Sequence, residues 1–264
     1  MDARSKISVN VISEHGYKAA LFGLGLSYGI TSKMDYAKFC EDEEAKKKLS
    51  DVAVKLATRD GGHNKFLESI KIWLDVNAPL FWWTESDTYR LTSKQSASTM
   101  HTLVKEIKQF SEFLTNYFGL DNKEHEDFCD IITEIKLAEW HSGGKSVFTD
   151  YLKSVEKYVI DNFDVWDDRS VENIMRIVIE MAYQVAKCDQ SEENLIYCKA
   201  NLPSSYMQRR EWVIDYKTLR NIIMQRFNHR LPQWRIFCEE VMKNIKHPEL
   251  IKKEINAFGG IVLK

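Results

Sequence analysis

The chain has 264 residues, enough to bury a sizeable core, and its 37 Lys and Arg residues nearly balance its 39 Asp and Glu residues. This balance excludes a strong overall attraction to nucleic acid or to an anionic membrane surface, so we expect neither a nucleic acid polymer nor a membrane as partner. No apolar run approaches the roughly 20 residues that cross a bilayer. The segment MDARSKISVNV lacks the apolar stretch of a secretory signal, and we expect a cytoplasmic protein.

The cysteines predict neither a disulfide framework nor a zinc site, because they are odd in number and form no Cys-X-X-Cys pair. His125 and Cys129 stand one helical turn apart, but without a second pair of ligands this spacing is more typical of packing than of metal binding. We therefore expect reduced, mostly structural cysteines and no bound metal. The five residues are Cys40, Cys129, Cys188, Cys198 and Cys238.

The first part of the chain predicts two strands separated by helical sequence. Apolar and polar residues alternate over 7–11, which is the period of a half-buried strand. Residues 35–59 have helical character, and the two glycines that follow suit a helix C-terminus. Alternation returns at 70–76 with the four residues Ile70, Ile72, Leu74 and Val76 on one face, until Pro79 interrupts strand pairing.

Residues 101–190 differ in character and predict a helical insertion in a single domain that spans residues 1–264. The breaks GLDN, HSGGKS and DVWDD are too short to be linkers. The predicted helical stretches are HTLVKEIKQFSEFLTNYF, EDFCDIITEIKLAEW, VFTDYLKSVEKYVIDNF and VENIMRIVIEMAYQVAKC.

The last third returns to mixed structure. LPSSYMQRREWVIDY predicts a short strand, and YKTLRNIIMQRFNHR predicts a helix that Pro232 separates from a following helix, QWRIFCEEVMKNI. Arg226 falls on the apolar stripe of this first helix, where a cation must snorkel to solvent, pair with an acid or hold an anionic ligand. The pattern leaves these alternatives open. A polar stripe of Asn221, Gln225 and Asn228 is more typical of a solvated face unless other residues indicate a site.

The stretch TYRLTSKQSAS, residues 88–98, concentrates hydroxyl groups, one amide and two cations just after the aromatic run FWW. A solvated loop has this composition, and so does a site for a phosphate-bearing ligand. For the aromatic run, core packing of at least two of Phe81, Trp82 and Trp83 is favoured over stacking on a ligand ring.

This stretch resembles the signature RHRxxSxNxxSxRY of the flavin-dependent thymidylate synthases. Arg90, Ser93 and Ser98 keep the spacing of the signature, and Gln95 replaces its asparagine with another amide. Upstream, GH is kept, with the histidine at His63. The surrounding order, a strand, then an AP dipeptide, then the signature, also agrees.

A second block, more than a hundred residues later, resembles the same family. LP precedes a strand, a helix of the form LxNxxxxR, and QW, which places Asn221 and Arg226 on nucleotide-binding positions. Gln233 matches after one extra residue, and Lys199, just before LP, replaces an arginine. The two blocks cover roughly a third of the chain, which resembles a divergent member of the sort that bacteriophages carry.

Three departures bear on function more than on fold. Thr88 and Tyr89 replace the leading arginine and histidine of the signature, and Met100 replaces its last arginine. Weaker contacts to flavin phosphate and to the nucleotide are the expected consequence. Lys94, Arg209 and Arg210 are the cations that we expect to compensate if flavin binding is kept.

The resemblance implies an α+β fold in which a twisted sheet and helices carry the large helical insertion, assembled as a homotetramer with sites at subunit junctions. It implies bound FAD, deoxyuridylate (dUMP) as substrate, methylenetetrahydrofolate as carbon donor and NADPH as reductant. Because reduced flavin delivers a hydride in this family, no cysteine need attack the pyrimidine. The reaction is one-carbon transfer to C5 of dUMP.

The implied site residues fall into three groups. The catalytic residues are Ser98 and Arg226, and Ser98 is not expected to be a nucleophile because no histidine and acid accompany it. The cofactor-binding residues are Arg90, Ser93, Gln95, His63 and Asn221. The substrate-binding residues are Ser96, Ser98, Lys199, Arg226 and Gln233.

Simpler interpretations remain open for several of these residues. The hydroxyls of Ser96 and Ser98 would cap the following helix, and Arg90 would form a surface ion pair with Glu85 or Asp87. At the level of the whole chain, the alternatives are flavin-dependent hydroxymethylation of a pyrimidine deoxynucleotide and a catalytically silent, nucleotide-binding homologue.

Overall fold

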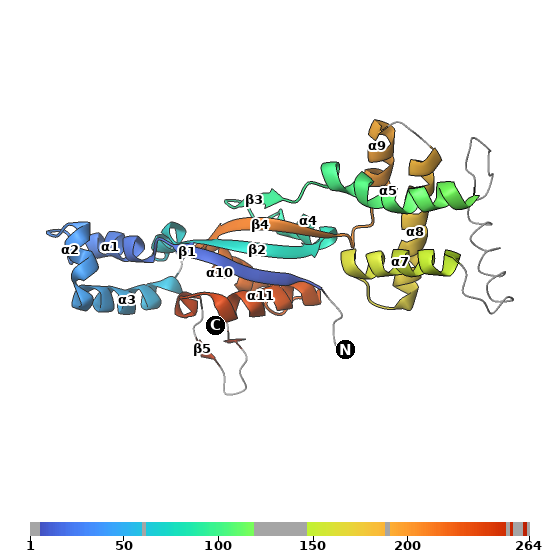
Figure 1. The fold of residues 1–264 in the computed structure, drawn as a ribbon. Helices are drawn as coiled ribbons and strands as arrows, with labels where there is room; N and C mark the ends of the chain where they lie inside the picture. The colour runs from blue at the N-terminus through green and yellow to red at the C-terminus, as the bar shows by residue number, and fades with distance from the viewer. Residues whose placement is uncertain are drawn as a thin grey trace. The chain divides into compact units, whose positions relative to one another are not determined.

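The computed structural model describes residues 6–59, 62–118, 147–187, 191–251, 254–255 and 261–262. Its contacts divide the chain into two compact units (Figure 1). The helical unit contains Ala97–Met207, and the sheet unit contains Lys6–Ser96 and Gln208–Lys264.

The sheet unit combines four paired strands with helices from both ends of the chain. Its strands are β1 (Ser8–His15), β2 (Lys71–Pro79), β3 (Ser93–Ser96) and β4 (Met207–Asp215). Its helices are α1 (Tyr17–Ser27), α2 (Tyr36–Glu41), α3 (Glu43–Ala57), α4 (Leu80–Ser86), α10 (Tyr216–Arg226) and α11 (Pro232–Asn244). The described part of this unit also contains the short 3₁₀ turns η1 (Lys65–Ser69) and η2 (Pro248–Leu250) and a small strand pair, β5 (Glu254–Ile255) with β6 (Ile261–Val262).

The order of the strands is β1-β2-β4-β3, so the signature stretch forms one edge of the sheet. β1 and β2 pair antiparallel with Val9 opposite Val76, and their register shifts between Val11 and Ser13. β3 pairs antiparallel with β4, which places Gln95 opposite Glu211. Both strands that alternation predicts near the start are thus confirmed.

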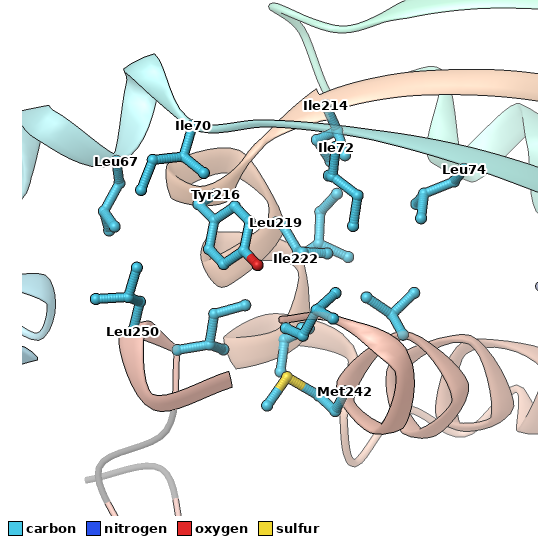
Figure 2. Close-up of a cluster of buried hydrophobic side chains, with 14 of the residues drawn as sticks. Leu67, Ile70, Ile72, Leu74, Ile214, Tyr216, Leu219, Ile222, Met242 and Leu250 are labelled. Atoms are coloured by element: carbon cyan, nitrogen blue, oxygen red, sulfur yellow. The ribbon is translucent and has the colours of Figure 1, made fainter. Parts of the chain in front are cut away.

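The core of the sheet unit lies between the sheet and the helices α10 and α11 (Figure 2). Ile70, Ile72, Leu74 and Val76 have no exposed surface, as their shared face predicts. Leu219 and Ile222 of α10 are equally buried against them, as part of the predicted apolar stripe. Complete burial of each such aliphatic side chain stabilises the fold by about 1.5 to 3 kcal/mol, so this layer holds the site elements in place.

Aromatic side chains fill the same core beneath the signature stretch. Trp82 and Trp83 are fully buried, which confirms the prediction of core packing for two of the FWW residues. The ring centroid of Trp82 lies 4.5 Å from that of Trp234, 5.3 Å from Phe237 and 6.0 Å from Trp212. Residues from α4, β4 and α11 therefore meet in one aromatic cluster, defined here as Trp82, Trp83, Trp212, Trp234 and Phe237.

Helix termini in the sheet unit differ in two places from the sequence prediction. The helical segment 35–59 is two helices, because Asp42 interrupts it and its carboxylate accepts a hydrogen bond from Ala45 N (2.8 Å). The glycines do not cap α3, since this helix ends at Ala57 with Thr58 as its C-cap. Pro232 begins α11 at the first helical turn, in agreement with the predicted break.

The helical unit contains helices α5 (Thr99–Phe118), α7 (Val147–Asn162), α8 (Asp168–Lys187) and α9 (Ser191–Asn201). The first three agree with predicted helical stretches. We did not predict α9, whose apolar residues lie on different sides: Cys198 is buried and Ile196 is 62% exposed. The predicted helix EDFCDIITEIKLAEW lies outside the described residues, as do His125 and Cys129.

α8 packs against α5, α7 and α9. The fold class is the expected mixture of helices and antiparallel strands. Within the described ranges, no helix is both long enough and apolar enough to cross a membrane.

Candidate functional site

The signature stretch presents polar groups at the edge of the sheet. In β3, Ser93 and Gln95 alternate with Lys94, whose ammonium group lies 4.7 Å from the buried Trp212 ring, so the other two side chains point to the opposite face. Ser93, Gln95 and Arg90 are exposed. Among the described residues, none of these three side chains has a hydrogen-bond or ion-pair partner, and they form a free donor set next to one another in sequence.

The surface ion pair considered for Arg90 does not form. Glu85 instead lies 3.2 Å from Arg226, and Asp87 pairs with Lys94 (2.8 Å) and Arg210 (3.2 Å). Both candidate acids already have cationic partners, so the guanidinium of Arg90 is left for another anion.

The cations expected to compensate for Thr88 and Tyr89 are occupied. Lys94 Nζ donates to Ser86 O (2.9 Å) and to Asp87, and Arg210 stacks 4.5 Å from the Trp83 ring centroid. Burial lowers the pKa of Lys94 against the opposing effect of Asp87. Partial burial alone would raise the pKa of Asp87, but Lys94 and Arg210 together bring it below its usual value. These groups hold β3 against α4.

Arg209 is held by Asp75 on the neighbouring strand. Its Nε and Nη2 donate to the two carboxylate oxygens at 2.7 and 2.6 Å, and these hydrogen bonds lower the pKa of Asp75. A carboxyl group with a lowered folded-state pKa stabilises the fold above its unfolded pKa of about 3.9, and this contribution is lost as the pH falls through the folded-state value.

When the pH is lowered from about 5 to about 2, we therefore expect the free energy of unfolding to fall less in Asp75→Asn than in the wild type. The free energy of unfolding in urea, measured across this range, tests the prediction. Equal pH dependence in the two proteins would contradict it.

Leu91 carries backbone strain within the signature stretch. Its φ is 63°, the only positive value of a non-glycine residue among those described, and its side chain is 86% exposed. The left-handed conformation costs an L-residue about 1 to 2 kcal/mol, whereas glycine adopts it freely at an entropic cost of about 0.5 to 1 kcal/mol. Strain of this kind is found at ligand sites and switch regions.

We expect Leu91→Gly to raise the free energy of unfolding by about 0.5 kcal/mol. Leu91→Ala is the matched control, because it removes the exposed side chain but keeps Cβ and the strain. Urea unfolding that shows destabilisation by Leu91→Gly relative to Leu91→Ala would refute this account of the backbone.

Arg226 lies at the centre of a polar cluster under α10. Its Nε donates to the Tyr89 hydroxyl (2.8 Å), and its Nη1 lies 3.2 Å from Glu85 Oε2 and 2.8 Å from His229 Nε2. The guanidinium carbon is 4.9 Å from the Trp234 ring centroid. Of the three alternatives for this residue, pairing with an acid is realised, while 21% of the side chain stays exposed.

The other predicted residues of the second block differ in how far they are exposed to solvent. Asn221 and Gln225 are exposed on α10, and Asn228, the third residue of the polar stripe, is exposed two residues after the helix ends. Gln233 has no exposed surface at the start of α11, so its nucleotide contact stays a prediction that the observed burial does not support. Asp215, the residue before α10, caps this helix by accepting a hydrogen bond from Thr218 N (2.8 Å).

Ser98 and Lys199 belong to the helical unit, whereas Arg226 and the rest of the predicted site belong to the sheet unit. Ser98 directly precedes α5, and its carbonyl accepts a hydrogen bond from the Thr102 hydroxyl (3.0 Å). The side-chain hydroxyls of Ser96 and Ser98 cap no helix within the described residues, so the simpler interpretation of them is not realised. Lys199 is exposed in the last turn of α9.

His63 lines an open pocket of about 650 Å³ between α1, the end of α3 and η1. Gly23 and Ser27 of α1 and Tyr28, the C-cap of this helix, line the pocket together with Phe66 and Ser69 of η1. His63 is thus next to a concave surface in the sheet unit that could hold a ring-shaped ligand.

The sequence does not predict the partners of Arg226. It indicates Glu85 only as a possible partner of Arg90 and Tyr89 only as the loss of a signature histidine, and it assigns no role to His229 or Trp234. The available signal was the i, i+3 spacing of Arg226 and His229.

Three described cysteines, Cys40, Cys198 and Cys238, are free thiols. Burial raises the pKa of Cys238 to about 12 and that of Cys198 to about 11, so both remain protonated at neutral pH. No group of three or more His, Cys, Asp or Glu side chains within the described ranges has the arrangement of a metal site.

Comparison with known proteins supports the fold. No family model and no curated protein matches the sequence. Two structures of the flavin-dependent thymidylate synthase ThyX from Helicobacter pylori, in complex with FAD and dUMP, match with a TM-score of 0.62 and 12% identity. The first match covers 92% of this chain and 97% of the enzyme.

The UMP/dUMP methylase PolB from Streptomyces cacaoi, bound to 5-Br UMP, matches with a TM-score of 0.51 and 14% identity over 97% of this chain and 96% of the other. At these identities the likeness concerns architecture. The chain has the fold of the flavin-dependent thymidylate synthase ThyX over nearly its full length.

Proposed function

We propose that this chain is a flavin-dependent enzyme that transfers a one-carbon unit from methylenetetrahydrofolate to C5 of dUMP. The observation that carries the proposal is the near-full-length likeness to ThyX structures that contain FAD and dUMP. Further support comes from Arg90, Ser93 and Ser98, which keep the spacing of the family signature, and from Asn221 and Arg226 in the second block that resembles the family. A homotetramer is part of the proposal.

On this proposal, the nucleotide monophosphate is held chiefly by Arg226. A phosphate carries about two negative charges, and a guanidinium offers fork-shaped, charge-assisted hydrogen bonds. Ser96, in the same unit, donates a hydroxyl group. Ser98 and Lys199 keep the nucleotide contacts that the family resemblance implies for them. Asn221 is exposed for contact with flavin or nucleotide.

The donor set of the signature stretch fits a phosphate-bearing and amide-bearing cofactor such as FAD. Arg90, Ser93 and Gln95 are exposed and have no partners among the described residues, and His63 lines a pocket large enough for an aromatic ring system. Reduced FAD, when bound, supplies the hydride that converts the transferred methylene unit to methyl, and NADPH restores the reduced state. The C5 hydrogen of the pyrimidine leaves as a proton.

Product analysis tests this function. The protein is incubated with dUMP, methylenetetrahydrofolate, FAD and NADPH, and the nucleotide is examined by mass spectrometry, with UMP in a parallel reaction because of the likeness to PolB. A gain of one methyl group supports the proposal. A hydroxymethyl group would replace it with the hydroxymethylation alternative, and unchanged nucleotide in both reactions would overturn it.

One observation favours a second candidate, a nucleotide-binding homologue without flavin chemistry. Lys94, Arg209 and Arg210 are all engaged with Asp87 or Asp75, so none of them replaces the cationic groups missing at Thr88 and Tyr89. This candidate predicts dUMP binding without FAD binding. Equilibrium dialysis with each ligand separates it from the enzyme.

A further inference from the structure

The hydrogen bonds of Arg226 use only part of its guanidinium. Nε donates to Tyr89, and Nη1 contacts Glu85 and His229. Within the part of the chain that the structure describes, Nη2 has no hydrogen-bond partner. Since a guanidinium carries five N–H groups, the two N–H donors of Nη2 remain for a ligand.

The plane of this guanidinium is fixed from more than one side. The Trp234 ring lies 4.9 Å from its central carbon and has no exposed surface. Trp234 Nε1 also donates to Glu85 Oε2 (2.9 Å), the oxygen that contacts Arg226. Glu85, whose carboxylate balances the charge of Arg226, is thereby held in place. Because these side chains are already ordered, ligand binding costs less conformational entropy.

Tyr89 fixes the remaining edge. Because the guanidinium only donates, the Tyr89 oxygen must accept from Nε, and the Tyr89 hydroxyl proton is then available for Gln225 Oε1 at 3.0 Å. This directional chain, Arg226 to Tyr89 to Gln225, requires the hydroxyl. The Tyr89 ring packs 6.0 Å from that of Trp234, a contact that phenylalanine would keep.

His229 supports the same arrangement less completely. Its Nε2 must accept from Arg226 Nη1, which puts the proton of the neutral ring on Nδ1. The contact of Leu231 N with Nδ1 (3.2 Å) requires the opposite tautomer, so only one of the two hydrogen bonds forms at a time. Tyr89, whose contacts are mutually compatible, is therefore the stronger anchor.

We infer that Tyr89 is a positioning residue, which orients Arg226 so that its free Nη2 group binds an anionic oxygen of a pyrimidine nucleotide. This inference rests on the proposed function, because it presumes that the chain binds such a nucleotide. It gives Tyr89 a role at the position where the family signature has a histidine. The change at this position then builds part of the nucleotide site instead of only weakening a flavin contact.

The test compares the affinities for dUMP and for deoxyuridine, which lacks the phosphate, in the full-length protein. Tyr89→Phe removes the hydroxyl and keeps the ring, and it is expected to weaken dUMP binding about three- to tenfold while changing deoxyuridine binding less than about twofold. Arg226→Lys should show the same selectivity with a larger loss. Tyr17→Phe, which removes a hydroxyl bonded to Ser50 in the same unit (2.8 Å), is the matched control and should leave both affinities unchanged.

The outcomes separate this inference from the proposed function. A wild-type protein that binds neither nucleotide overturns both. If dUMP binds and Arg226→Lys weakens it, but Tyr89→Phe does not, the positioning role alone is overturned. Equal weakening of dUMP and deoxyuridine by Tyr89→Phe would indicate a general structural role and would also overturn the inference, with thermal unfolding of each variant confirming that it is folded.

Discussion

Arg226→Lys is expected to weaken the binding of dUMP about tenfold to hundredfold. Lysine keeps the positive charge but not the planar fork, so it cannot contact Tyr89, Glu85 and a phosphate at the same time. Hydrogen bonds to charged groups contribute about 1.5 to 3 kcal/mol each, which sets the size of the effect. Isothermal titration calorimetry with dUMP measures it.

Arg235→Lys is the matched control, because Arg235 is an exposed arginine on α11 that lies outside the polar cluster around Arg226. Its affinity for dUMP should equal that of the wild type. An unchanged affinity in Arg226→Lys would show that Arg226 is a structural residue whose pairing with Glu85 is its whole role. The lysine variant is preferred to alanine, since alanine would leave Glu85 half-buried without its cation.

Trp82→Ala is expected to lower the free energy of unfolding by about 3 to 5 kcal/mol. Trp82 is fully buried, and its ring contacts four other members of the aromatic cluster. Truncation removes this buried area and leaves a cavity among large, rigid rings that cannot close it easily. Because Trp234 borders Arg226, the same change should also weaken dUMP binding in the folded fraction.

Trp166→Ala serves as the control, since the Trp166 side chain is 45% exposed. Its unfolding free energy should stay within about 0.5 kcal/mol of the wild type. Urea denaturation of both variants gives the comparison. A loss of less than about 1.5 kcal/mol for Trp82→Ala would mean that the aromatic cluster is more adaptable than its burial indicates.

Helices and strands could be predicted from the sequence where the period of the apolar residues was regular and a proline marked the end or start of an element. Ile70 to Val76 alternate strictly and form a buried strand face, and Pro232 marks the start of α11. The sequence does not predict the break between α2 and α3 at Asp42. An acidic residue within a charged helical segment is typical of a solvated helix face. The capping carboxylate of Asp42, which accepts from Ala45 N, is visible only once the backbone turns there.

The candidate site was predictable as a set of residue types but not as a set of contacts. Arg226 was identified from its spacing, yet its partners Glu85 and Tyr89 lie more than 130 positions away in the sequence. No local pattern links them, because the contact depends on α4 and α10 packing around one tryptophan. Gln233 matched by spacing alone, and the structure buries it.

Thr88 and Tyr89, which depart from the family signature, make contacts that the spacing of the motif does not predict. The Thr88 hydroxyl donates to the Glu85 carbonyl (2.7 Å) and so closes the turn after α4. Tyr89 instead turns toward Arg226. Both residues therefore make hydrogen bonds within the sheet unit, and the partner of Tyr89 is the guanidinium of Arg226.

Flavin reoxidation shows whether this chain couples reduced FAD to one-carbon transfer. The protein is loaded with FAD, reduced anaerobically, and mixed with dUMP and methylenetetrahydrofolate while the visible absorbance of the flavin is followed. Transfer with methyl formation consumes a hydride, so we expect reoxidation only when both substrates are present, with one methylated nucleotide for each flavin oxidised. A flavin that stays reduced, or a protein that cannot be loaded with FAD, would overturn the proposed function.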